Sequence, residues 1–215
     1  MLEKMAEFFE RRLDGYDQHM LTNIQSAREF YPFTAQNLPQ EPGCRILDLG
    51  CGTGLELEYY YPMNPTAKVT GIDLSKGMLD ALRAKFTDRD LELIPGSYFD
   101  VDLGEAVFDG AVSVESLHHF TQAEKTDLYR KITKSLKNGG FFILTDYFAV
   151  SQEEEKSFRQ ELEQLKAEAG IREGFYHFDT PLTVVNETQA LLDGGFTKVE
   201  ILGAWGATAT LRATK

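Results

Sequence analysis

Short hydrophobic runs rich in β-branched and aromatic residues alternate with amphipathic helical patterns along most of the chain. The runs are CRILDLG, AKVTGID, LELIPGS, FDGAVSV and GFFILTDYF, followed near the end by TKVEILGAW and GATATLRAT. Strands that alternate with helices indicate parallel strands joined by helical crossovers, and therefore an α/β fold. The last two runs leave no room for a helix between them, so they predict an antiparallel hairpin.

Capping patterns help to place the helices. Thr121 and Ser151 each begin a Thr/Ser-x-x-Glu capping pattern, so a helix is expected to start after each of them. The Asn-Gly-Gly at 138–140 predicts the end of the first of these helices. Residues 2–36 also have a helical pattern, and the Pro-containing LPQEPG joins them to the first strand.

A strongly charged helical pattern follows the fifth strand, in residues 151–170. Phe158, Leu162, Leu165 and Ala169 fall on one stripe of this helix, and charged residues occupy its other faces. We therefore expect an exposed amphipathic helix whose charged residues form a solvated face.

The charge of the chain is strongly acidic. It has 22 basic and 34 acidic residues, a net charge of −12 and a pI of about 4.8. Proteins that bind nucleic acid need clusters of basic residues that displace phosphate counterions, and the basic clusters here do not exceed pairs such as Arg11-Arg12. We expect no nucleic-acid partner. The acidity either maintains solubility or favours a cationic ligand, and both interpretations stay open.

The cysteines and the first residues bear on the compartment. Cys44 and Cys51 lie too close together in sequence for a disulfide framework, which favours a reducing environment. The first residues alternate charged and apolar side chains, unlike a signal peptide, and no run approaches 18 apolar residues. We expect a cytoplasmic protein without a membrane segment.

A glycine-rich turn, LDLGCGTG, lies between the first predicted strand and a helix. This order suits a ligand at the carboxyl end of the strand, where backbone N–H groups and a helix N-terminus face outward. The spacing Gly50-x-Gly52-x-Gly54 departs from the dinucleotide fingerprint, because Leu55 stands where the third glycine belongs. No Lys-Ser/Thr follows the turn, which excludes a phosphate-binding P-loop.

Two carboxylates accompany this turn. Asp48 precedes the first glycine by two residues, and we expect it at the mouth of the ligand crevice. There it would repel a pyrophosphate by roughly 1 to 4 kcal/mol and attract an ammonium or sulfonium group. Asp73 ends the second strand, where a carboxylate accepts hydrogen bonds from ribose hydroxyls. The alternative to a ligand-binding role is a structural one: Asp48 would be a plain turn residue, and Asp73 would help to start the following helix. The predicted ligand is nucleoside-like, cationic and free of phosphate.

LDLGCGTG followed by GIDLS resembles the class I S-adenosylmethionine-dependent methyltransferases, and the resemblance continues through ESLHHF and LKNGGFFILTDY over about residues 40–215. It implies a Rossmann-like three-layer sandwich whose seven-stranded, mostly parallel sheet has the order 3-2-1-4-5-7-6 with strand 7 antiparallel. It also implies S-adenosylmethionine as cofactor and S-adenosylhomocysteine as product. We interpret 1–215 as one domain, with a helical cap (1–40), a cofactor-binding half (41–150), a lid insertion after strand 5 (151–182), and a final helix and hairpin (183–215).

The resemblance also implies roles for individual residues. The methionine end and sulfonium would be lined by Asp48, Gly50, Cys51 and Gly52, the ribose held by Asp73, the adenine flanked by Leu74 and Met78, and the sulfur flanked by Glu115, Ser116 and Leu117. Many relatives have Gly-Asp after strand 3, where this chain has Gly96-Ser97-Tyr98. Ser97 and the Tyr98 backbone would then contact the adenine, with Asp100 as a substitute.

The acceptor is expected to be a small molecule. The chain lacks the Asn/Asp-Pro-Pro-Tyr and Pro-Cys motifs of nucleic-acid enzymes in this family, and methyl transfer needs a general base only for weakly acidic acceptors. His118 or His119 would act as base or orient the acceptor, unless they are packed structural residues. No His/Cys cluster has zinc spacing, so we predict no metal. Candidates for the acceptor wall are Tyr16, His19, Tyr31, Tyr147, Tyr176, His177 and Asp179.

Three other functions stay open. HFDTPLTVVNETQALLDGGF resembles a segment of carboxy-S-adenosylmethionine synthase, which needs an arginine for the added carboxylate, and Arg172 is the nearest candidate. A protein that binds the cofactor without chemistry and an NAD-dependent oxidoreductase are the remaining alternatives. The sequence leaves a monomer and a homodimer equally open.

Overall fold

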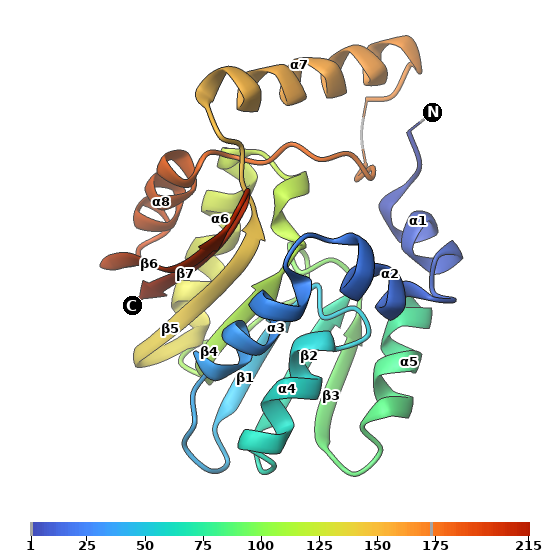
Figure 1. The fold of residues 1–215 in the computed structure, drawn as a ribbon. Helices are drawn as coiled ribbons and strands as arrows, with labels where there is room; N and C mark the ends of the chain where they lie inside the picture. Colours follow the sequence, from blue (N-terminus) through green and yellow to red (C-terminus); the bar gives the residue numbers. More distant parts are fainter. Residues whose placement is uncertain (1, 173) are drawn as a thin grey trace.

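The computed structural model describes residues 2–172 and 174–215 and arranges them as a central sheet with helices on both faces (Figure 1). The sheet has the order β3-β2-β1-β4-β5-β7-β6. Strand β7 runs antiparallel to both of its neighbours, and the other pairs are parallel. The predicted fold class is confirmed. The strands are β1 (Arg45–Leu49), β2 (Lys68–Asp73), β3 (Asp90–Pro95), β4 (Phe108–Val114), β5 (Leu136–Tyr147), β6 (Lys198–Trp205) and β7 (Thr208–Thr214).

The helices cover the sheet in two groups because successive strand residues point to opposite faces. In β1, Ile46 packs into a hydrophobic cluster with helices α3, α4 and α5, whereas Leu47 packs into a second cluster with α6 and α8. These helices are α3 (Ala27–Gln36), α4 (Leu55–Met63), α5 (Lys76–Lys85), α6 (Gln122–Ser135) and α8 (Val184–Asp193).

Two short helices and one long helix lie outside these layers. Helices α1 (Met5–Arg11) and α2 (Tyr16–Asn23) lie beside the loops at the carboxyl ends of the parallel strands (Figure 1). Helix α7 (Gln152–Glu168) crosses above the sheet, and Leu162 is its one buried side chain, as the amphipathic pattern predicted. Every helix of the described residues is too short or too polar to span a lipid bilayer.

The N-terminal residues pair with the segment that follows α7. The backbone N–H of Met5 donates to Phe175 O at 3.1 Å, and the N–H of His177 donates to Glu3 O at 3.0 Å. An isolated antiparallel bridge joins Lys4 to Tyr176 between them. Two segments that are far apart in the sequence therefore lie side by side above the sheet.

Two local predictions need correction. Helix α6 ends at Ser135, so the Asn-Gly-Gly at 138–140 lies within β5 and does not stop the helix. The pairing of β4 with β5 jumps between Phe108 and Gly110, and this irregularity absorbs the extra residues of β5. The capping box is complete at Thr121, but at Ser151 only half of it forms, because the Glu154 carboxylate accepts from the Val150 N–H instead.

Candidate active site

The glycine turn connects β1 to α4 at the carboxyl edge of the sheet. Gly50, Gly52 and Gly54 have φ angles of +72°, +49° and +74°, a region that side chains other than glycine rarely adopt. A Cβ placed on Gly50 would lie 2.1 Å from Ser116 Oγ. The turn therefore needs glycine both for its backbone conformation and for its close contact with the loop after β4.

Asp73 connects this turn to the next one. Its Oδ2 accepts the Gly52 N–H at 2.9 Å, and its Oδ1 accepts the Ser75 N–H at 2.8 Å. Ser75 in turn caps α5. Burial raises the pKa of Asp73, while the backbone N–H donors oppose that rise. A carboxylate offers about four lone-pair sites, so two remain for hydroxyl groups of a ligand.

A small cavity of about 50 Å³, which we call the inner cavity, lies between the glycine turn and the loop after β4. Eight residues that the sequence predicted for the cofactor line it, and they come from the loops after four different strands. These are Gly50, Gly52, Asp73, Leu74, Met78, Tyr98, Glu115 and Ser116.

The position predicted for Asp48 is wrong. Its side chain points to the same face as Ile46, beneath α4, and is 1% exposed, so it lies behind the glycine turn and not at the mouth of a crevice. Burial and the neighbouring Glu56 raise the pKa of Asp48. Among the described residues, Asp48 Oδ2 and Glu56 Oε1 have no hydrogen-bond partner. Burial also raises the pKa of Glu56, so this buried pair favours protonated carboxyl groups and gives no strong negative potential behind the turn.

Three further predicted cofactor residues also lie outside the cavity wall. Cys51 is buried and packs against Gly71, with its Sγ 2.8 Å from where a Cβ of that glycine would be. Ser97 Oγ accepts the Phe99 N–H within its own turn. Leu117 is fully buried because it faces the core. The predicted contacts of these side chains with the cofactor are therefore not supported by their positions.

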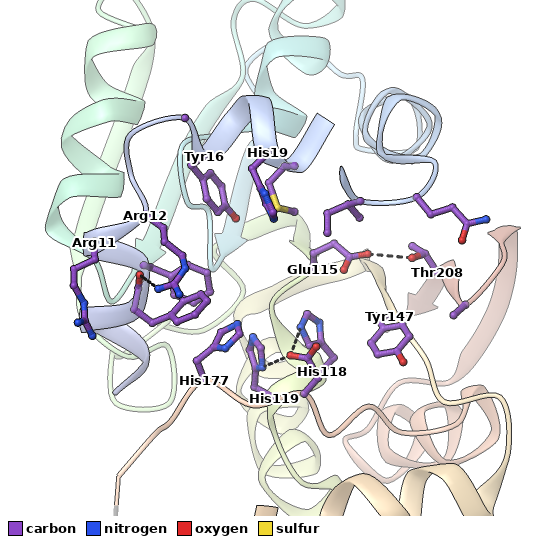
Figure 2. A pocket seen from close by; sticks show the side chains of 18 of the residues that line it. Arg11, Arg12, Tyr16, His19, Glu115, His118, His119, Tyr147, His177 and Thr208 are labelled. Carbon is purple, nitrogen blue, oxygen red and sulfur yellow. Dashed lines mark hydrogen bonds and ion pairs between the residues drawn. The ribbon is translucent and has the colours of Figure 1, made fainter. Parts of the chain in front are cut away.

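A second cavity of about 680 Å³, the outer cavity, lies between the N-terminal helices, the loop after β4 and the segment before α8. Figure 2 shows Tyr16 and His19 on one side of it, facing His118, His119 and His177 on the other. Five of the seven candidates for the acceptor wall line this cavity together with both histidines of the 3-10 helix η1 (Leu117–His119): Tyr16, His19, Tyr147, His177 and Asp179.

Tyr31 and Tyr176 do not line the outer cavity. Tyr31 belongs to α3, is 3% exposed and packs beside Phe30 in the hydrophobic core. Tyr176 is used in the bridge to Lys4. Other wall residues were not predicted, although aromatic residues that recur within a charged amphipathic pattern were a usable signal. The unpredicted residues include Phe8, Phe9, Arg11, Arg12, Met20, Ile24, Trp205 and Thr208.

Hydrogen bonds organise the two histidines of η1. His118 Nδ1 lies 2.6 Å from Asp146 Oδ1, and its Nε2 lies 3.5 Å from Asp179 Oδ1. His119 Nδ1 lies 3.3 Å from the same Asp179 oxygen and 3.2 Å from Phe178 O. Both nitrogens of the His118 ring are therefore engaged, whereas the contacts of His119 all involve Nδ1.

The surrounding charges shift the pKa values of these two histidines in opposite directions. Burial lowers the pKa of His118, but Asp146 and Asp179 outweigh it and raise the pKa to about 10. Burial and the charge on His118 lower the pKa of His119. Burial and Asp146 raise the pKa of nearby Glu115 to about 7. The carboxylates thus favour the protonated form of His118, whereas the surroundings of His119 favour its neutral form.

The N-terminal segment separates the two cavities. Phe9, Tyr16, Glu115 and His119 line both of them. Glu10 fixes α1 to the start of α5, because its carboxylate accepts from Ser75 Oγ at 2.6 Å and from the Gly77 N–H at 3.1 Å. Phe9 and Tyr16 are thus part of the wall that the inner and outer cavities share.

The chemical types of the residues at the inner cavity fit S-adenosylmethionine. Gly50 and Gly52 allow close approach of a ligand to the backbone, Asp73 has free lone pairs, and two unpartnered buried carboxyl oxygens lie behind the turn. Leu74 and Met78 supply an apolar wall. Pockets for ligands of this size have volumes of about 300–1,000 Å³. The inner cavity alone is smaller than this, so we infer that binding joins it to the outer cavity, with which it shares Phe9 and Tyr16 of the N-terminal segment.

Comparisons with known proteins agree with this architecture. A family model described as a methyltransferase domain matches residues 46–140. A carboxy-S-adenosyl-L-methionine synthase of Wolinella succinogenes is 31% identical over 238 residues, covering 100% of this chain and 95% of that protein. An uncharacterized methyltransferase of Synechocystis is 32% identical over 124 residues, covering 58% of this chain and 57% of that protein. The matched part of this chain spans less than two thirds of the length of several curated relatives, including the Synechocystis protein.

A solved structure has the same fold over most of the chain. It is an S-adenosylmethionine-dependent methyltransferase from Mesorhizobium loti, with a TM-score of 0.61 and 22% identity. The match covers 86% of this chain and 96% of that structure.

Proposed function

This chain belongs to the class I S-adenosylmethionine-dependent methyltransferase family, and we propose that it methylates a small molecule bound in the outer cavity. The observation that carries the proposal is that Glu115 and His119 line both cavities. An acceptor in the outer cavity would meet the methyl donor at these two residues.

The proposed cofactor site uses the loops at the carboxyl edge of the sheet. S-adenosylmethionine supplies a methyl group on a sulfonium sulfur, so the protein has mainly to bind and orient. Asp73 would accept both ribose hydroxyls, while Leu74 and Met78 would contact the adenine. Gly50 and Gly52 would allow the methionine end to approach the backbone, next to Ser116. Orientation of donor and acceptor contributes on the order of 7 to 11 kcal/mol at best.

The outer cavity has the composition of a small-molecule pocket. Its volume of about 680 Å³ lies within the range for such ligands, and aromatic side chains meet a few polar groups in its wall. His119 is the better placed of the two histidines to contact the acceptor, because both ring nitrogens of His118 are engaged by carboxylates. His177 stacks on Phe8 with ring centroids 3.5 Å apart, which supports a role as an aromatic wall.

A direct test fills the outer cavity. Ala207 lies in its wall, and Ala207→Trp should abolish turnover of any acceptor found by metabolite screening, with S-adenosylhomocysteine formation as the readout. The affinity for S-adenosylhomocysteine, measured by calorimetry, serves as the internal control and should change less than threefold. Unchanged turnover in this variant, or methylation of nucleic acid or protein with none of small molecules, would contradict the proposal.

The second candidate function is carboxy-S-adenosylmethionine synthesis, which is favoured by the full-length similarity to the Wolinella protein. This reaction needs an arginine for the added carboxylate. Arg172 is exposed and lines neither cavity, and Arg11 and Arg12, which line the outer cavity, both contact Glu3. Mass spectrometry of the ligand that copurifies with the protein distinguishes the two functions, because a carboxylated sulfonium would overturn the methyltransferase proposal.

A further inference from the structure

Three side chains from two distant segments converge in the wall of the outer cavity. His118 and His119 belong to η1 after β4, and Asp179 belongs to the segment before α8. Each offers one nitrogen or oxygen atom, and these three atoms lie within 4.8 Å of one another. The spacing of residues in the sequence gave no sign of this group, because 59 residues separate its two histidines from the Phe178–Asp179 pair.

The separations match the edges of a coordination polyhedron. Asp179 Oδ1 lies 3.5 Å from His118 Nε2 and 3.3 Å from His119 Nδ1. A tetrahedral ion that bonds nitrogen and oxygen at about 2.0–2.2 Å holds its ligand atoms about 3.4 Å apart. The same Asp179 oxygen thus stands at ligand-to-ligand distance from both rings without any rearrangement of the backbone.

The surroundings resemble those that orient metal-binding histidines. Ligating histidines usually donate their other ring N–H to a carboxylate, which fixes the orientation of the ring. Asp146 is fully buried and plays this part for His118, with 2.6 Å between Asp146 Oδ1 and His118 Nδ1. Asp146 is itself held by the Leu117 and Tyr147 N–H groups, each at 2.9 Å. His118 Nε2 is therefore directed towards Asp179.

The local charge favours a cation. Glu115, Asp146 and Asp179 are all within reach of His118, and Glu115, His118 and Asp146 form a second group of ligand atoms within 4.8 Å. Two imidazoles and a carboxylate are typical ligands of Zn²⁺, Fe²⁺ and Co²⁺ rather than of Mg²⁺, which prefers oxygen.

We propose that His118 Nε2, His119 Nδ1 and Asp179 Oδ1 bind a divalent transition-metal ion whose open position faces the outer cavity. When the ion binds, His118 Nε2 releases its proton to solvent, and His119 gives up its hydrogen bond to Phe178 O and carries its proton on Nε2 instead of Nδ1. The inference rests on the proposed function, since it makes the acceptor an oxygen compound whose hydroxyl or carboxylate completes the coordination. Three protein ligands with one open position are the pattern of catalytic metal sites.

Cobalt(II) alone tests the site without any turnover. Untagged protein, freed of metal by a chelator, is titrated with Co²⁺ and followed by visible absorption and calorimetry. We expect one ion per chain, with Asp179→Asn and His119→Gln each weakening its affinity at least 100-fold. Asp146→Asn should weaken it 10- to 100-fold, the usual effect of losing a partner of a metal ligand. His19→Gln is the matched control, because His19 lies on the opposite side of the cavity and should leave the affinity unchanged (Figure 2).

The outcomes separate the site from the proposed function. No stoichiometric binding, or binding that Asp179→Asn and His119→Gln leave unaltered, overturns the metal site. The Asp179 side chain is 45% exposed, so its substitution should not unfold the protein, and circular dichroism melts check this. Binding of S-adenosylhomocysteine is measured in the same samples. If the protein binds S-adenosylhomocysteine but not cobalt, the metal site alone is refuted. If it does not bind S-adenosylhomocysteine, the proposed function is refuted.

Discussion

Replacement of Asp73 by alanine should weaken cofactor binding more than any other single change at the inner cavity. Its carboxylate has two lone-pair sites left after accepting the Gly52 and Ser75 N–H groups, and these would hold both ribose hydroxyls. Hydrogen bonds to charged groups contribute about 1.5–3 kcal/mol each. Losing two of them costs about 3–6 kcal/mol, which corresponds to a rise in Kd of roughly 10²- to 10⁴-fold.

The assay is calorimetric titration with S-adenosylhomocysteine. Asp80→Ala is the control, because Asp80 is exposed on the helix that follows and pairs there with Lys76. Asp73→Ala also leaves two backbone N–H groups without an acceptor, so its thermal unfolding is measured in parallel. If Asp73→Ala stays folded and binds within fivefold of the unaltered protein, Asp73 does not hold the ribose and the inner cavity has been wrongly assigned.

Three further predictions concern the turn, the core and the N-terminal helices. Gly50→Ala should abolish S-adenosylhomocysteine binding in calorimetry because its Cβ would collide with Ser116, whereas Gly139→Ala, at a similar φ of +78° but with open space, should not. Lys125→Met should destabilise the protein by about 3–5 kcal/mol in urea unfolding, since it leaves Glu187 buried and without its cation, and adding Glu187→Gln should recover most of the loss. Binding of S-adenosylhomocysteine should change the hydrogen exchange of amides in α1 and α2, and unchanged exchange would refute the inferred joining of the two cavities.

The fold was predictable because its determinants are local and repeated. The alternation of strand and helix patterns indicated a parallel sheet, and the absence of a helix between the last two strands indicated the hairpin that β6 and β7 form. The seven-stranded order came from the family resemblance. The exact end of α6 was not predictable, because the irregular pairing of β4 with β5 is a property of two strands and not of the Asn-Gly-Gly itself.

The candidate site was predictable for residues whose positions depend on a single strand or turn. Asp73 and the glycines could be placed together at one cavity because they occupy fixed positions at the ends of β2 and β1. The side chain of Asp48 was misplaced because the direction of a strand residue depends on its register in the sheet. The contacts of His118 and His119 with Asp179 could not be foreseen, because they form only when the segment before α8 returns across the sheet.

The pairing of residues 3–5 with residues 175–177 has a consequence for the order of assembly. During synthesis the N-terminal helices emerge first, but their partner segment appears only after β1 to β5 and α7 have been made. Contacts between such distant parts of a chain form slowly. The outer cavity is thus among the last features to be completed, because its wall also includes Trp205 of β6 and Thr208 of β7, whereas β1 to β5 and the glycine turn are synthesised before it.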